Sequence, residues 1–183
     1  MDTALDNIKQ MGVVFKVFFY TLFYLTPIYV LVYWFSNGDF EPLRPLIQII
    51  PDDLPQINSI PYLNQLFGFL ITMIPMGFVM AILYSLARLF RLYQHGYIFT
   101  GENVCLIRRM AYLMLTAQLA KPVFDILISI NMTIHNPPGE RVMLLLNYTT
   151  MNLGLIITSF LILMIAYVMD EGRKLKEVDE LTI

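Results

Sequence analysis

The sequence predicts an all-α, polytopic membrane protein: a bundle of four transmembrane helices with both termini in the cytoplasm. Hydrophobic residues make up 57% of the 183 residues and charged residues 14%, whereas a soluble domain carries about a quarter charged residues. The mean hydropathy is +0.63. The charges cluster between long apolar runs, which is typical of membrane-spanning helices. We expect a single membrane domain over residues 1–183.

The first predicted span covers residues 13–35 and follows an amphipathic lead-in over residues 1–12. At about 1.5 Å per residue it is long enough to cross a hydrocarbon core of roughly 30 Å. Pro27 is expected to kink the helix. No basic segment precedes the span, so we expect it to be retained and not cleaved as a signal peptide. Aromatic residues near its outer end are expected to form an interfacial belt: Tyr29, Tyr33 and Trp34.

An external loop is predicted for residues 36–62, which contain five prolines and four acidic residues beside a single arginine. So many prolines argue against a regular helix or a central strand. Two interpretations stay open for this loop: a structured linker, or an external sensing or ligand-binding loop.

The second predicted span, residues 63–87, carries no formal charge and contains Pro75, an expected kink. Small residues recur every four positions in its second half, and such a stripe lets another helix approach closely. The stripe could face a helix of the same chain or a second copy of the protein. Its members are Gly77, Ala81 and Ser85.

A cytoplasmic connector, residues 88–109, joins the second and third spans and carries four arginines. Gly96 is expected to end the preceding helix as its C′ residue, because glycine adopts the left-handed conformation required there. Thr100 is expected to cap the next helix. Glu102 would follow in the first turn, where the helix dipole favours an anion.

The third predicted span, residues 110–133, contains the one pair of opposite charges expected inside the membrane. Lys121 and Asp125 lie four residues apart, on one face of a helix, with Pro122 between them. A charge at a helix centre costs about 2.5–3.5 kcal/mol on insertion scales. The pair is therefore interpreted as a structural salt bridge, as part of an ion or proton path, or as a switch.

A tight external turn is predicted for residues 135–141, and the fourth span for residues 148–169, whose first part is polar. The charged residues 170–183 form a cytoplasmic tail. Nine of the twelve lysines and arginines fall in the lead-in, the first turn of the first span, the connector and the tail. Arg44 and Arg141 fall on the other side, and this asymmetry places both termini in the cytoplasm.

The chemistry expected of the chain is not that of an enzyme. Cys105 is the only cysteine, so neither an intrachain disulfide nor a cysteine metal cluster can form. His95 and His135 are predicted on opposite sides of the membrane, and no catalytic or nucleotide-binding motif occurs. We expect no catalytic residue, cofactor or metal site. The basic patch is small and lies against the bilayer, which argues against direct nucleic acid binding.

Two stretches resemble a bacterial family of small four-helix membrane proteins catalogued as domain of unknown function 2975. Residues 96–111 read Gly-Tyr-Ile-Phe-Thr-Gly-Glu-Asn, then an apolar stretch and a basic pair, and are similar to that family's connector. Residues 171–183, which close in Leu-Thr-Ile, resemble its carboxyl terminus, with Val178 as a departure. The resemblance does not extend to Lys121 and Asp125. It implies a bacterial membrane protein that accompanies small helix-turn-helix regulators of the Cro/CI type.

We therefore expect an integral protein of the bacterial cytoplasmic membrane that is regulatory and binds a cytoplasmic partner, sequestering a small helix-turn-helix transcription regulator. The alternative is a small oligomeric transporter or channel subunit that uses the Lys121–Asp125 pair. Homo-oligomers are possible in either case. The basic residues could also serve only to orient the chain and contact anionic lipid. Candidate partner-binding residues lie on the cytoplasmic face: Arg88, Arg91, Phe99, Thr100, Glu102, Asn103, Arg108, Arg109, Arg173 and Lys174.

Overall fold

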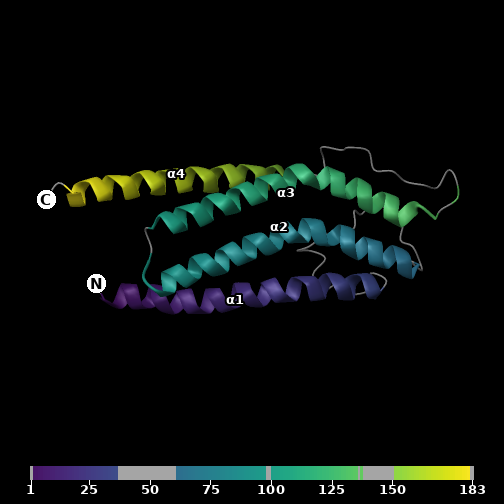
Figure 1. Cartoon of the computed structure of the whole chain (residues 1–183), viewed down its shortest axis with the longest axis horizontal. Helices are drawn as coiled ribbons and strands as arrows, with labels where there is room; N and C mark the ends of the chain where they lie inside the picture. The colour runs from purple at the N-terminus through teal and green to yellow at the C-terminus, as the bar shows by residue number, and fades with distance from the viewer. Residues whose placement is uncertain (1, 37–60, 98–99, 136, 138–150, 182–183) are drawn as a thin grey trace. The chain divides into compact units, whose positions relative to one another are not determined.

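The computed structural model describes residues 2–36, 61–97, 100–135, 137 and 151–181, and within these ranges the chain is helical without strands. The four helices are α1 (Asp2–Phe35), α2 (Tyr62–Gln94), α3 (Gly101–Thr133) and α4 (Leu153–Leu181) (Figure 1). All four are long and apolar enough to cross a membrane. The predicted all-α, four-span class is confirmed, and the chain is a multi-pass membrane protein.

Each helix contains or overlaps one predicted span and continues beyond it. A helix of 33 residues such as α2 measures about 50 Å at about 1.5 Å per residue, well over the roughly 30 Å of a hydrocarbon core. The amphipathic lead-in is continuous with α1. Most of the predicted external loop, most of the turn at residues 135–141 and most of the polar start of the fourth span lie outside the described residues. The limits of the spans within the helices stay predictions.

The chain divides into two compact units. Unit 1 comprises Met1–Tyr24, Val79–Thr116 and Leu153–Ile183, and unit 2 comprises Leu25–Phe78 and Ala117–Asn152. Helices α1, α2 and α3 contribute to both units, and α4 belongs to unit 1.

Unit 1 is held by apolar contacts of α2 with both α1 and α3. Leu89 of α2 forms a buried cluster with Leu106 and Met110 of α3. On the α1 side, the ring of Phe90 stacks on those of Phe15 and Phe19, with centroid distances of 4.9 and 5.5 Å. Aromatic pairs at such separations stabilise beyond the area that they bury. These contacts bring the α2 end of the connector against α1.

Gly12 allows α1 to approach the backbone of α2. A Cβ atom at this position would lie 2.8 Å from the backbone nitrogen of Gln94 and 3.0 Å from the carbonyl oxygen of Phe90. One turn later, the Lys16 ammonium donates a hydrogen bond to Gln94 Oε1 at 2.7 Å. No sequence pattern singled out this glycine. The close approach was predicted instead at the stripe that begins with Gly77, where a Cβ atom would meet nothing within 4 Å.

Gly12→Val is expected to destabilise the protein by about 1–3 kcal/mol, because the added atoms meet backbone and not a flexible side chain. The matched control is Gly77→Val, where the chain leaves open space, so the control should change stability by less than about 0.5 kcal/mol. Unfolding by sodium dodecyl sulfate, followed by circular dichroism, measures both. Equal destabilisation of the two variants would show that α1 does not approach α2 at Gly12.

Unit 2 is built around the single tryptophan. Trp34 is 1% exposed and packs in a buried cluster with Val30, Met76 and Ile128. Its indole N–H donates to Thr72 Oγ1 at 3.1 Å. Gly68 lies directly beneath the ring, since a Cβ there would overlap three ring carbons. The predicted interfacial role of Trp34 is therefore wrong: the ring is a core residue whose polar atom is satisfied inside the protein.

Tyr29 is likewise buried in the same cluster, and Tyr33 packs against the cluster. A group of aromatic residues near a helix end does not distinguish a ring that faces lipid from one that faces a neighbouring helix. The pairing of Trp34 with Gly68 and Thr72, on a helix distant in sequence, decides the outcome.

Candidate functional site

The connector begins with the helix end that the sequence predicts. Gly96 has a φ of 81°. Its N–H donates to the carbonyl oxygen of Tyr93, and the N–H of Tyr97 donates to that of Leu92, both at 3.0 Å. These two bonds are the Schellman pattern, in which a left-handed C′ residue satisfies the last carbonyls of a helix. The predicted role of Gly96 is confirmed, and the chain leaves α2 in a defined direction.

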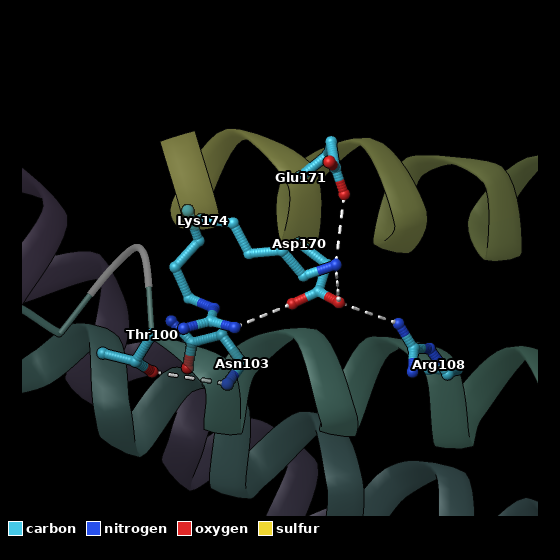
Figure 2. Close-up of polar contacts among 7 residues, drawn as sticks. Thr100, Asn103, Arg108, Asp170, Glu171 and Lys174 are labelled. Carbon is cyan, nitrogen blue, oxygen red and sulfur yellow. Dashed lines mark hydrogen bonds and ion pairs between the residues drawn. The ribbon is translucent and has the colours of Figure 1, made fainter. Parts of the chain in front are cut away.

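The start of α3 is tied to the same turn. The backbone N–H of Asn103 donates to Thr100 Oγ1 at 3.4 Å, which confirms Thr100 as the N-cap (Figure 2). Asn103 is fully buried, and its side-chain amide donates to the carbonyl oxygen of Tyr97 at 2.7 Å. Thr100 and Asn103, two candidate partner-binding residues, therefore shape the connector from within.

Two other candidates pair with each other. The Arg88 guanidinium donates to Glu102 Oε1 through Nε at 2.9 Å and through Nη2 at 2.6 Å. This ion pair joins the end of α2 to the first turn of α3. Both side chains are about half exposed, 48% and 44%, so the pair contributes at most about 1 kcal/mol. Its main effect is to set the geometry of the two helix ends.

A second ion-pair network joins α3 to α4 and centres on Asp170, which no sequence pattern singled out. Its carboxylate lies 3.5 Å from Arg108 Nη2, 3.1 Å from Arg173 Nη2 and 3.6 Å from Lys174 Nζ. Lys174 also reaches Glu171 at 3.1 Å. Figure 2 shows the carboxylate between the arginine of α3 and the cations of α4. Three candidate cations thus share one internal anion.

Arg108 has a further contact with α4. Its guanidinium carbon lies 4.8 Å from the centre of the Tyr167 ring, within the range of a cation–π interaction. Arg173 lies near the start of α3, since its Nε would be 3.8 Å from a Cβ at Gly101. The start of the charged carboxyl-terminal part of α4, Asp170 to Lys174, is therefore held against the first turns of α3.

Replacing the shared anion is expected to release this extension. In Asp170→Asn, Arg108, Arg173 and Lys174 lose their common partner, and local opening should become more frequent. The expected result is about a fivefold faster tryptic cleavage after Arg173 or Lys174 in detergent micelles. Glu171→Gln is the control, since it removes only one contact of Lys174. Equal cleavage rates in Asp170→Asn and the wild-type protein would contradict a role for Asp170 in holding α4.

The remaining candidates are the exposed ones. Arg91 on α2 and Arg109 on α3 are exposed, and neither forms an ion pair with any residue that the structure describes. Tyr97, in the turn between them, is 58% exposed. Phe99 lies outside the described residues, as do the side chains of residues 176–183.

The membrane pair forms as predicted. Lys121 Nζ lies 3.0 Å from Asp125 Oδ1 and 2.9 Å from Oδ2. The Lys121 side chain is 37% exposed and that of Asp125 13%. Both residues belong to unit 2, whereas Arg91, Tyr97 and Arg109 belong to unit 1.

Unit 2 contains a polar contact that was not predicted from the sequence. Asn64 Nδ2 donates to the carbonyl oxygen of Asn131 at 2.9 Å, and Asn131 Nδ2 donates to that of Asn64 at 3.0 Å. Both residues are more than nine-tenths buried. Interhelical hydrogen bonds stabilise membrane helix pairs by about 1 kcal/mol. Asparagines in apolar helices indicate that polar contacts form between helices. Which asparagines pair could not be predicted, because the pairing depends on the register of α2 and α3.

Comparison with known proteins places the chain in a family. The family model described as "Protein of unknown function (DUF2975)" matches residues 50–183, well over half of the chain. This range includes the connector and the charged extension of α4. No curated protein and no solved structure matches the chain. The resemblance predicted from the connector and the carboxyl terminus is confirmed: the chain belongs to the DUF2975 family of proteins of unknown function.

Proposed function

We propose that this protein is a non-enzymatic membrane regulator whose cytoplasmic face, formed by the connector and the charged extension of α4, binds a cytoplasmic protein. The partner that we propose is a small helix-turn-helix transcription regulator, which would be sequestered at the bacterial cytoplasmic membrane. The orientation with both termini inside, inferred from the distribution of lysine and arginine, is part of the proposal.

One observation carries the proposal: within the described part of the connector, both helix ends are capped and tied to each other, so that its shape is fixed. A Schellman turn, an N-cap, the Asn103–Tyr97 bond and the Arg88–Glu102 pair all act within one short segment. A braced surface loses little conformational entropy when it binds, which raises affinity. Contacts within the chain explain why Thr100, Glu102 and Asn103 are polar. The exposed residues near them are left to contact a partner.

The exposed residues have the chemistry of a binding surface. Tyr97 is exposed at the braced turn, Arg91 in the last turn of α2, and Arg109 on α3 eight residues after its start. Tyrosine and arginine are the residue types enriched at the energetic centres of protein interfaces. The Asp170 network would couple partner binding to the position of the carboxyl-terminal part of α4. A partner that contacts Arg108 or Arg173 would compete with Asp170 for these arginines. Binding would then depend on the position of the α4 extension.

Reversal of the exposed charges tests this function. Wild-type protein and the Arg91→Glu, Arg109→Glu double variant are crosslinked in cells, purified in detergent and examined by mass spectrometry. We expect the wild-type protein to recover a helix-turn-helix regulator and the variant to recover at least about tenfold less, as charge reversal at interfaces typically causes. The control exchanges the internal pair, Arg88→Glu with Glu102→Arg, and should retain the partner. Equal recovery by the charge-reversed variant would contradict the proposed surface.

The second candidate function is a small oligomeric transporter or channel subunit. The observation that favours it is the Lys121–Asp125 pair near the middle of the predicted third span, since ionisable groups inside a membrane commonly mark ion or proton paths. Four spans give little room for a path within one chain, so this function would require several copies. Flux of protons or monovalent cations in proteoliposomes, with and without Asp125→Asn, tests it.

A further inference from the structure

The Lys121–Asp125 pair lies on the side of α3 that faces the protein core of unit 2. Ile128 follows Lys121 by seven residues, and Met132 follows Asp125 by seven, so each lies two turns further along the same face. Ile128 is 4% exposed and Met132 6%, and both belong to the cluster around Trp34. The charged pair is therefore aligned with buried core residues and not with lipid-facing ones.

The opposite side of α3 is apolar and open. Leu119, Val123 and Leu127 are 59%, 52% and 38% exposed, as expected for a face that contacts lipid tails. Val123 is two residues from Lys121, which at about 100° per residue places the two side chains on nearly opposite sides of the helix. The 37% exposure of Lys121 therefore does not belong to the lipid-facing stripe.

With the third span at its predicted limits, residues 110–133, Lys121 lies too deep to reach either membrane surface. Arg109 precedes it by twelve residues and Thr133 follows by twelve, so each end of this stretch is about 18 Å away along the helix axis. A lysine side chain extends its ammonium by only about one helical turn when it snorkels. The pair is thus near the middle of a hydrocarbon core of roughly 30 Å.

The ammonium is not fully satisfied by the carboxylate. It carries three N–H donors, and its two close contacts are the two oxygens of Asp125. No other partner for the Lys121 ammonium occurs among the residues that the structure describes. A charged donor without a partner in hydrocarbon costs several kcal/mol, so the exposed side of this ammonium requires a polar neighbour.

We propose that the Lys121–Asp125 pair is a water-accessible site at mid-depth of the membrane, where the exposed ammonium binds water and small hydrophilic ions reach the pair. The inference is independent of the proposed docking function, which concerns residues of unit 1. According to this proposal, the Lys121–Asp125 pair is in contact with water and is not a salt bridge enclosed in a dry protein interior.

Cysteine accessibility tests the proposal, because methanethiosulfonate reagents react with a thiolate, which forms in water and not in lipid. Cys105→Ser provides a background without cysteine, into which Lys121→Cys and Val123→Cys are introduced separately. A membrane-impermeant quaternary ammonium reagent is applied to intact cells and to inside-out vesicles. Ile134→Cys, beyond the end of α3, serves as the reactive control. A second version of the Lys121→Cys variant carries Asp125→Asn, so that no carboxylate is left without its partner.

We expect Lys121→Cys, alone or with Asp125→Asn, to be modified from at least one side at least about tenfold faster than Val123→Cys, although Val123 is the more exposed side chain in the isolated chain. Failure of both Lys121→Cys versions to react from either side, while Ile134→Cys reacts, would show that the pair is dry. If Val123→Cys reacts as fast as Lys121→Cys or faster, the reagent reaches the apolar side of α3 at least as well as the Lys121 side. The Lys121–Asp125 pair would then not be a specific water-accessible site. Either result overturns the proposal.

Discussion

Trp34→Ala is expected to destabilise the protein by about 3–5 kcal/mol, the range measured for removal of large aromatic side chains from protein cores. Trp34 is 1% exposed, packs on Gly68 and donates to Thr72. The substitution removes the centre of the unit 2 cluster and leaves the Thr72 hydroxyl without its indole donor. The surrounding side chains come from three helices, so they cannot close the cavity without moving backbone.

Phe35→Ala is the matched control for Trp34→Ala. The two aromatic residues are adjacent on α1, but Phe35 is 50% exposed, so its removal should cost less than about 1 kcal/mol. Unfolding in mixed micelles by sodium dodecyl sulfate, followed by circular dichroism, compares the two variants. Similar midpoints for Trp34→Ala and Phe35→Ala would mean that the indole ring lies outside the protein core, as in the interfacial belt that the sequence predicts.

Lys121→Met is expected to cost about 3–5 kcal/mol, because it leaves the Asp125 carboxylate without a partner inside the membrane. Asp125→Leu should cost less, since the ammonium that remains is the more exposed member of the pair, 37% against 13%. The expected order of destabilisation is therefore Lys121→Met above Asp125→Leu. This asymmetry follows from the proposal that water reaches the lysine side of the pair.

The double variant Lys121→Met, Asp125→Leu separates the cost of an unpaired charge from the value of the pair itself. Replacing a buried ion pair by apolar residues of similar size is often nearly neutral. We expect the double variant to recover most of the stability lost in Lys121→Met, measured by the same unfolding assay. A double variant as unstable as Lys121→Met would show that the pair contributes a net attraction on which the fold depends.

Much of the fold follows from local signals in the sequence. The four apolar runs predict four helices because a span must satisfy every backbone group internally. Gly96 and Thr100 act through the backbone of their own turn, so their roles as C′ residue and N-cap could be predicted without knowledge of any neighbour. The Lys121–Asp125 contact could likewise be predicted from the sequence, since side chains four residues apart on a helix are adjacent.

The rest depends on contacts between helices distant in sequence. Asp170 lies sixty-two residues from Arg108, and no local pattern indicates that one carboxylate joins α4 to α3. Gly12 and Gly68 differ from the open Gly77 only in what lies opposite them. Small residues allow two helices to approach each other closely, but the register between the helices determines at which small residue they do so. The two helix ends of the connector could therefore be predicted, whereas the contacts that most of the candidate residues make within the chain could not.

Site-specific photocrosslinking at Tyr97 tests the central claim, a protein-binding surface at the connector, most directly. A photoreactive phenylalanine analogue replaces Tyr97, which is 58% exposed at the braced turn, and a control replaces Ile157, which is 60% exposed on the apolar part of α4. After irradiation of intact cells, we expect the Tyr97 position to yield a covalent adduct with a helix-turn-helix regulator, and the Ile157 position to yield none. Adducts at Tyr97 with lipid alone, or with further copies of this chain alone, would contradict the docking function.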